Sequence, residues 1–237
     1  MADLATDIRS LAANCDQTLD ELHDDYVHTR MLWRGLQVRV LRHKKKLRVH
    51  NPITKSILDG VQLASRAPTS VQRLTKRSFK DIVAKFEHFV AELLQMWLVE
   101  NPDLISEKAL NVATLLASKT LLEAQTAAKR EAVESSVADK MYGRPDKWFN
   151  YLKSKLGAEF DADDKGLFIE MKARRDVLEH SNGIVEATYL EKAEDFAKYR
   201  LGDQVRLSGQ DVDEAYQLVS RLIRNIAESV VAKLKRS

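Results

Sequence analysis

Cysteine, glycine, proline and aromatic side chains are all scarce in this sequence of 237 residues. Its single cysteine, Cys15, excludes a disulfide framework or a zinc site made of several cysteines within one chain. Eight glycines and four prolines leave few places for tight turns, which favours long helices. Aromatic residues make up 7%, few for a sheet protein, whereas 44% apolar residues suffice for a helical core. The composition predicts an all-α fold.

Long apolar runs are also missing from the chain. No stretch approaches the ~18 residues that a membrane span needs, and the N-terminus does not resemble a signal peptide. We therefore expect a cytoplasmic protein without a membrane partner. The six histidines have no spacing typical of a metal site, since His23 and His28 are five residues apart rather than three or four. We expect no metal and no cofactor.

Acidic residues are nearly absent from residues 26–80. This stretch holds fourteen Lys and Arg and one acid, Asp59, so it carries +13 whereas the whole chain carries +3 and the other residues −10. Such a block suits a phosphate backbone or an acidic partner, but it also describes a solvated helix face, because no aromatic ladder for base stacking accompanies it. Its densest part supplies our first candidate RNA-binding residues: Arg39, Arg42, Lys44, Lys45, Lys46 and Arg48.

Apolar residues at steps of three, four and seven predict one long helix over residues 4–40. Its apolar seam would be covered by a helical hairpin or a coiled-coil partner. A short helix around residues 53–61 and a break at residues 67–70, which contain Pro68, are expected next. We accordingly divide the chain into a basic N-terminal helical extension, residues 1–68, and a helical domain, residues 69–237.

Periodicity and capping residues predict further helices after this break. They are expected over residues 71–101, from 106 to about 124, from Pro145 to Gly157, from Asp163 or Asp164 to Gly183, over 188–197, and from Ser208 or Asp211 onward. Polar residues 127–139 are expected to be a frayed helix end. Val205-Arg206-Leu207 is the only candidate for a strand, and it predicts one small β-hairpin near the C-terminus.

One block near the middle of the helical domain combines residues that can perform chemistry. Arg175 lies five residues before His180, Asp176 follows the arginine, and Asn182-Gly183 ends the helix. A cation and a titratable imidazole near one helix end can bind a phosphate and move a proton, as metal-free RNA cleavage requires. The spacing alone is a weak signal, because an arginine four to six residues before a histidine is expected roughly 1.4 times by chance in this sequence.

The positions of Arg175 and His180 on a helix limit how the two side chains can form one site. On a regular helix they point about 140° apart, because each residue turns ~100°. They converge only if the last turn unwinds, or if two chains bring their helices together, so a functional pair predicts a homodimer. If the block has no function, Arg175 and Glu179 form an ordinary surface ion pair, and His180 makes a favourable interaction with the C-terminal end of the helix.

The block Arg175-Asp176-Val177-Leu178-Glu179-His180 resembles the Arg-polar-x-x-x-His signature of HEPN domains, the higher eukaryotes and prokaryotes nucleotide-binding superfamily. The following Ser181-Asn182-Gly183-Ile184-Val185 is similar to the RiboL-PSP-HEPN branch. The resemblance covers residues 71–237 and implies a helical bundle that dimerises and, in many members, cuts RNA without metal. Asn182 stands where one toxin subgroup carries a modifiable tyrosine, which argues against that subgroup.

Carried onto this chain, the resemblance makes Arg175 and His180 the catalytic pair and Asp176 their polar companion. Arg174 and Asn182 are additional RNA-binding candidates beside them. The implied activity is a prokaryotic defence or toxin endoribonuclease that leaves 2′,3′-cyclic phosphate and 5′-hydroxyl ends. An antitoxin or another defence-system protein is a possible partner.

Two other readings remain open at this point. One is a HEPN-type binding module without catalysis, an accessory subunit of a larger defence system. The other is a helical scaffold that dimerises through the seam over residues 4–40.

Overall fold

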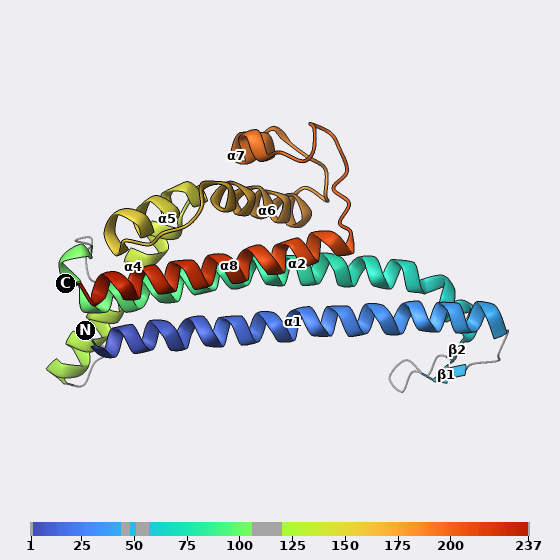
Figure 1. The fold of residues 1–237 in the computed structure, drawn as a ribbon, viewed down its shortest axis with the longest axis horizontal. Coiled ribbons are helices and arrows are strands. Elements are labelled where there is room, and N and C mark those ends of the chain that lie inside the picture. The colour runs from blue at the N-terminus through green and yellow to red at the C-terminus, as the bar shows by residue number, and fades with distance from the viewer. Residues whose placement is uncertain (1, 44–47, 51–56, 106–119, 237) are drawn as a thin grey trace.

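The computed structural model describes residues 2–43, 48–50, 57–105 and 120–236 (Figure 1). In these ranges the fold is all-α apart from one short pair of strands, which confirms the predicted class. The N-terminal half contains α1 (Ala2–His43), β1 (Arg48–His50), β2 (Ile57–Asp59), α2 (Gly60–Glu100) and the 3₁₀ turn η1 (Pro102–Leu104). The C-terminal half contains α4 (Leu121–Met141), α5 (Pro145–Tyr151), the π-helical turn η2 (Leu152–Leu156), α6 (Ala162–His180), α7 (Ala187–Ala193), the 3₁₀ turn η3 (Glu194–Phe196) and α8 (Gly209–Leu234).

The long N-terminal helix is confirmed as α1, and a helical hairpin with α2 covers its seam. Figure 1 shows α1 and α2 side by side and antiparallel over most of their length. The predicted seam residues Ile8, Cys15, Leu19 and Tyr26 are buried. Packing of this face is the main source of stability for so long a helix, since propensity alone contributes little in water.

The start of α2 differs from the prediction. Ile57–Asp59 form a strand that pairs antiparallel with β1, so the short helix expected around residues 53–61 is wrong at these three positions; residues 53–56 lie outside the described part. The α2 helix begins at Gly60, where Asp59 and Gln62 form a capping box. The ladder between β1 and β2 ends at that cap.

The predicted break at residues 67–70 is also wrong, because Pro68 lies inside α2. A proline in a helix removes one backbone hydrogen bond and crowds the carbonyl four residues earlier, at a cost of about 3 kcal/mol. Packing of the same turns offsets that cost, since Leu63, Ala64 and Ala67 are buried. The helix therefore continues across the boundary placed at residue 68.

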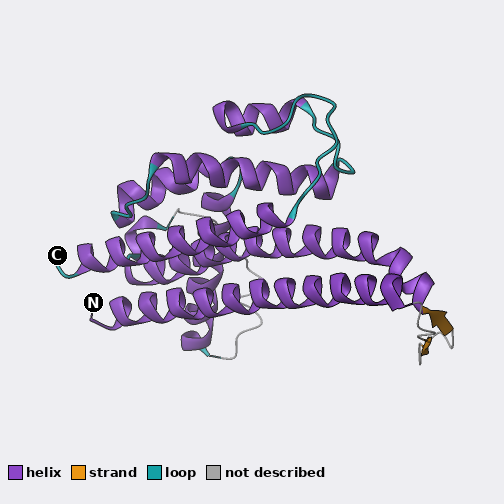
Figure 2. Cartoon of the chain, turned by 45° about the vertical axis from the view of Figure 1, so that its right-hand side comes forward, coloured by secondary structure: helices purple, strands orange, loops and turns teal. Residues whose placement is uncertain are grey.

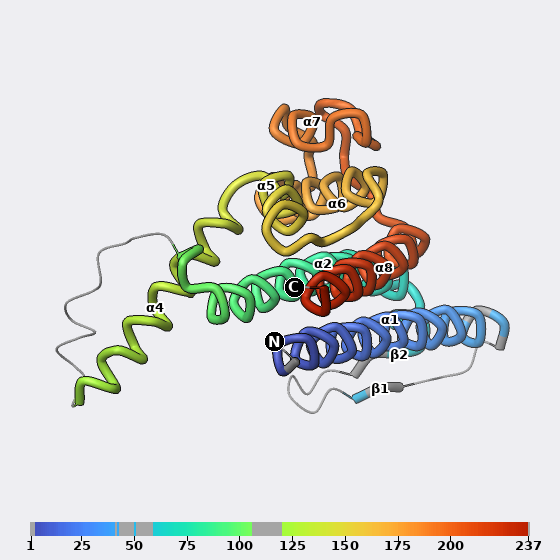
Figure 3. The backbone as a smooth tube through the Cα atoms, turned by 60° about the vertical axis from the view of Figure 1, so that its left-hand side comes forward, coloured from blue at the N-terminus to red at the C-terminus, as the bar shows by residue number. Residues whose placement is uncertain are grey.

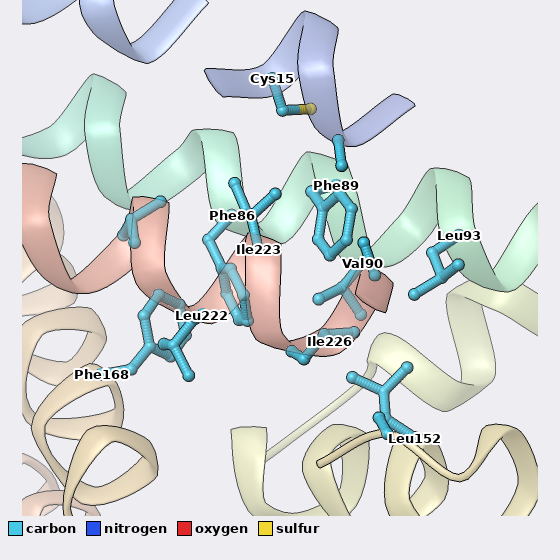
Figure 4. Packing of buried hydrophobic residues seen from close by; sticks show 14 of the residues in the cluster. Cys15, Phe86, Phe89, Val90, Leu93, Leu152, Phe168, Leu222, Ile223 and Ile226 are labelled. Atoms are coloured by element: carbon cyan, nitrogen blue, oxygen red, sulfur yellow. The ribbon is translucent and has the colours of Figure 1, made fainter. Parts of the chain in front are cut away.

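The molecule is built in layers, with α1 below α2 and α8, and α6 with α7 above them (Figure 3). Side chains from α1, α2, α5, η2, α6 and α8 share one hydrophobic core. Phe86 of α2 lies at its centre, with ring centroids 4.4 Å from Phe168 of α6 and 5.8 Å from Phe149 of α5. Figure 4 shows Cys15 of α1 and Ile223 of α8 in the same cluster. The N-terminal helix is thus part of the main core.

Several expected features of the C-terminal half are confirmed, and others are wrong. Pro145 opens α5, and Gly157 ends η2 with a φ of 73°. Residues 127–139 are helical within α4 rather than frayed. The N-cap of α6 is Asp161, because Asp164 is instead turned toward Arg221, whose Nε lies 2.8 Å from its Oδ2.

The remaining helices of the C-terminal half also follow the sequence closely. Of the two predicted caps of α8, Ser208 is the N-cap, and Asp211 completes a capping box with it. The short helix expected over residues 188–197 corresponds to α7 followed by η3. None of the helices in the described ranges is long and apolar enough to span a membrane.

The small hairpin expected around Val205-Arg206-Leu207 is wrong. Only one isolated bridge forms there, between Ile184 and Gln204. The Val205 N–H donates to the carbonyl of Gly183 at 2.8 Å, and the Val185 N–H donates to that of Asp203 at 2.9 Å. The backbone of residues 202–205 therefore hydrogen-bonds to the loop that follows His180, and no regular hairpin forms around Val205.

A smaller lobe lies on the outer face of α6, consisting of α7 and the loops on either side of it (Figure 2). It has a second hydrophobic cluster made by Ala173 and Val177 of α6 with Val185, Tyr189, Ala193 and Val205. Because Ala173 and Val177 precede His180 on the same helix, this lobe holds the end of α6 from outside while α2 and α8 hold it from inside.

Candidate functional site

The last turn of α6 is a regular helix up to His180. The Ser181 and Gly183 N–H groups both donate to the carbonyl of Val177, at 3.1 and 3.0 Å. Asn182 and Gly183 then adopt left-handed conformations with φ of 51° and 81°, as the predicted C-cap requires. The last turn is therefore not unwound, which leaves a second chain as the way to bring Arg175 and His180 together.

His180 and Arg175 do not meet within one chain. His180 is exposed at the helix end, and in the described part of the chain it has no hydrogen bond or ion pair. The Arg175 side chain is 16% exposed and is turned toward α2. Residues five apart on a helix point about 140° apart, so this divergence follows from the regular last turn.

Glu87 of α2 is the main partner of Arg175. Its Oε2 accepts a hydrogen bond from Arg175 Nη2 at 2.8 Å, and its Oε1 lies 2.6 Å from Lys172 Nζ. Both cations belong to α6, so this one carboxylate joins α2 to two successive turns of the helix that carries the motif. No sequence signal pointed to Glu87, because 88 residues separate it from Arg175.

Asp176 contacts Arg175 as predicted, but it has stronger partners. Its Oδ1 lies 3.4 Å from Arg175 Nη1, whereas its Oδ2 accepts from Lys192 Nζ of α7 at 3.0 Å. It makes no hydrogen bond or ion pair with His180 in the described structure. Asp176 therefore steadies the arginine and ties α6 to the outer lobe, rather than orienting the imidazole.

Glu179 forms the next ion pair along the same helix. It lies 3.1 Å from Lys80 Nζ of α2 and 3.8 Å from Arg175 Nε, so the i+4 pair that the sequence predicted is present but is the longer of the two. Lys80, Glu179, Arg175 and Glu87 thus form an alternating row of charges along the junction of α2 and α6, which we call the junction row.

Arg174 does not face solvent or RNA, and this prediction is wrong. Its side chain is completely buried, with Nη2 2.9 Å from Glu170 Oε2 and Nη1 2.5 Å from Asp211 Oδ1. The guanidinium also lies over the ring of Phe79, 4.9 Å from its centroid. One residue before Arg175, it is turned about 100° around α6 and enters the core beside α8.

The buried charges around Arg174 shift one another's pKa values. Burial raises the pKa of Glu170, whose Oε1 accepts a hydrogen bond from the Tyr189 hydroxyl at 2.7 Å. Burial and the neighbouring Glu170 carboxylate raise the pKa of Tyr189. Burial acts against ionisation of Asp211, but hydrogen bonds from Ser208 and the charge of Arg174 outweigh it and lower the pKa of that carboxyl. We call Glu170, Arg174, Tyr189 and Asp211 the buried ionic cluster.

The other predicted RNA-binding residues lie in two separate places. Asn182 is exposed directly after the helix that ends at His180. Arg39 and Arg42 are exposed near the end of α1, at the far end of the α1–α2 hairpin, so the structure does not bring them to His180 (Figure 1). Lys44, Lys45 and Lys46 lie outside the described residues, as does the side chain of Arg48.

Comparison with known proteins gives no match. No protein-family model matches the chain, and no curated protein or solved structure does. Among the residues that the structure describes, no group of three or more His, Cys, Asp and Glu could hold a metal ion. The functional argument therefore rests on the residues at the end of α6.

Proposed function

We propose that this protein is a metal-independent endoribonuclease of HEPN type that acts in the cytoplasm in prokaryotic defence or as a toxin. One observation carries the proposal. The Arg-Asp-x-x-x-His block ends a regular, well-capped helix on which His180 is exposed and Arg175 is turned away from it. The shared site requires a second chain whose His180 reaches the exposed edge of Arg175 at the junction of α2 and α6.

In this mechanism His180 supplies general acid–base catalysis and Arg175 supplies charge. The ribose 2′-oxygen attacks phosphorus while the bond from phosphorus to the 5′-oxygen breaks. His180 takes the 2′-hydroxyl proton or gives a proton to the leaving 5′-oxygen, and the second subunit supplies the complementary groups. The products are a 2′,3′-cyclic phosphate and a 5′-hydroxyl. DNA has no 2′-hydroxyl and should remain intact.

An apolar surface beside His180 supports association with a second chain. Ile184 and Leu201 are exposed, at 41% and 65%. They belong to two segments that are hydrogen-bonded together, since the Gly202 N–H donates to the carbonyl of Val185 at 2.9 Å. Exposed apolar residues rimmed by polar ones are typical of protein–protein contacts. Docking of two copies here would bring both α6 ends to the interface.

The test is cleavage of total RNA and tRNA by purified protein in EDTA. We expect the wild type to cut and Arg175→Ala and His180→Ala each to lose about 100-fold or more. His88→Ala and Arg130→Ala are matched controls, because both side chains are more than half exposed and, among the described residues, pair only with a neighbour on their own helix. Both variants should cut normally. Equal cutting by all five proteins would contradict the proposal.

A second candidate function is a HEPN-type module that binds RNA or a defence partner without cutting. The observation that favours it is the ion pair between Arg175 and Glu87, which already neutralises the arginine that a phosphate would need. This function predicts that wild-type protein binds labelled RNA or its partner in EDTA and leaves intact ends. Wild-type cutting that disappears with His180→Ala would exclude it.

A further inference from the structure

One ridge of α2 runs along the junction row and then past the end of α6. Seven residues turn an α-helix by about 700°, only ~20° short of two full turns, so positions 66, 73, 80 and 87 share one face. Lys80 and Glu87 on this ridge contact Glu179 and Arg175 of α6, at 3.1 and 2.8 Å. Arg73, one heptad before Lys80, therefore points to the same side of α2, and Arg66 follows one heptad earlier on the turn that precedes Pro68.

The ridge becomes open where α6 ends. The α1–α2 hairpin extends beyond the ends of α6 and α8 in both views (Figures 1 and 2). Arg66 and Arg73 are exposed, and neither has an ion pair with a residue in the described part of the chain. Arg77, next to this ridge, has an 83% exposed side chain and only a 3.4 Å pair with Asp81.

The charge on this face is of one sign. Residues 60–80 contain five Lys and Arg and no acid. The positions from Arg66 to Lys80 span about 21 Å along the helix axis. An array of exposed cations of this kind binds a polyanion by releasing its counterions.

We propose that Arg66, Arg73 and Arg77 form a phosphate-binding track along which an RNA strand reaches the Arg175–His180 site. This inference rests on the proposed function and adds to it the surface that holds the substrate outside the site. Arg66 lies near the same open end of the α1–α2 hairpin as Arg39 but on the other helix, and Arg73 and Arg77 follow it along α2 toward the junction row.

The residues between the arginines favour RNA over an acidic protein as the ligand. Most exposed side chains on this part of α2 are polar, among them Gln62, Ser65, Thr69 and Gln72, whereas Val61, at 71%, and Pro68 are the exposed apolar ones. Protein interfaces rely on clustered aromatic or large apolar anchors, and no aromatic side chain lies between Arg66 and Arg77. Phosphate contacts need none, since charge and hydrogen-bond donors suffice.

The track is tested by the salt dependence of RNA binding. The probe is a fluorescein-labelled single-stranded 20-mer with 2′-O-methyl riboses, which lacks the attacking hydroxyl and stays intact. Fluorescence anisotropy in EDTA at several salt concentrations compares wild type, Arg66→Ala/Arg73→Ala and the control Lys129→Ala/Arg130→Ala on exposed α4. We expect the first double variant to lose about 1.4 in the slope of log K against log salt and tenfold or more in affinity at 0.1 M salt. The control should match wild type.

Arg66→Lys/Arg73→Lys separates charge from structure, because it keeps both charges and should keep the slope. An alanine double variant with the slope and affinity of wild type would overturn the track. So would a labelled poly-glutamate peptide that binds more tightly than the RNA and loses that binding in the same variant. If wild-type protein fails to cut natural RNA but the slope still falls, the track stands and the nuclease proposal fails.

Discussion

Two neighbouring arginines of α6 have opposite surroundings. Arg174 is completely buried between two carboxylates and over an aromatic ring, whereas Arg175 keeps 16% of its side chain exposed in the junction row. The buried ionic cluster connects α6 to α7 and α8, and the junction row connects it to α2. A charge buried in this way stabilises the position of a helix, whereas a partly exposed one remains available to a ligand that can compete for it.

The largest effect should come from removing the buried charge. Arg174→Met keeps much of the side-chain volume but leaves the fully buried Glu170, and Asp211, whose side chain is 16% exposed, without their cation. Breaking a buried ion pair in this way costs about 3–5 kcal/mol of unfolding free energy. Urea unfolding measures it, with Arg175→Met, at the partly exposed position in the junction row, as the matched comparison. Equal losses for the two variants would remove the contrast between them.

Tyr189→Phe should destabilise the protein less. The hydroxyl donates to Glu170 at 2.7 Å and accepts from the Lys198 N–H at 3.0 Å, so its removal leaves a buried carboxylate oxygen without that donor. We expect a loss of about 1–3 kcal/mol in urea unfolding. Tyr142→Phe, at an 82% exposed position, is the control and should be neutral. A neutral Tyr189→Phe would show that Glu170 does not depend on this bond.

Glu87→Gln should make Arg175 more available to a phosphate ligand and leave the buried Arg174 unchanged. Freed from its carboxylate, Arg175 can bind phosphate, and we expect RNA affinity to rise about fivefold at 0.1 M salt. The control is Glu92→Gln on the same helix, whose carboxylate pairs with His88 at 2.7 Å. Weaker binding by Glu87→Gln would mean that Glu87 holds Arg175 in its working position instead of competing with the phosphate.

The smallest expected effect is a pH dependence from Asp211. Its folded pKa is lower than its ordinary value, so its contribution to stability is complete above that ordinary value of about 3.9 and is lost as the pH falls through the folded pKa. Urea unfolding at pH 6, 4 and 3 should show that wild type loses more stability than Asp211→Asn over the acid step. Parallel losses in the two proteins would contradict this.

The sequence predicted those features that depend on neighbours along one helix. The periodicity of residues 4–40 indicated α1 and its hairpin partner, and Asn182-Gly183 indicated where α6 ends. The sequence could not predict that Arg174 points into the core. A charged residue in a helix usually faces solvent, and Asp211, one of the carboxylates that allow this one to be buried, lies on another helix. Glu87 and Asp211 lie 88 and 37 residues from their arginines.

The errors have the same physical origin. Pro68 indicated a break because proline disfavours helix locally, and tertiary packing of α2 overrode that preference. Val205 indicated a strand, but its backbone N–H bonds Gly183 in the loop after the motif instead. In both cases a tertiary contact between residues distant in the sequence overrode the local conformational preference.

The most direct test of the shared site is a heterodimer of Arg175→Ala and His180→Ala chains, co-expressed with different affinity tags and purified through both. If each site takes its arginine from one chain and its histidine from the other, one of the two sites is intact, and the rate of RNA cleavage should recover to about half that of wild type. A doubly tagged heterodimer that cuts no faster than either variant alone would contradict the shared site, as would failure of the two chains to co-purify.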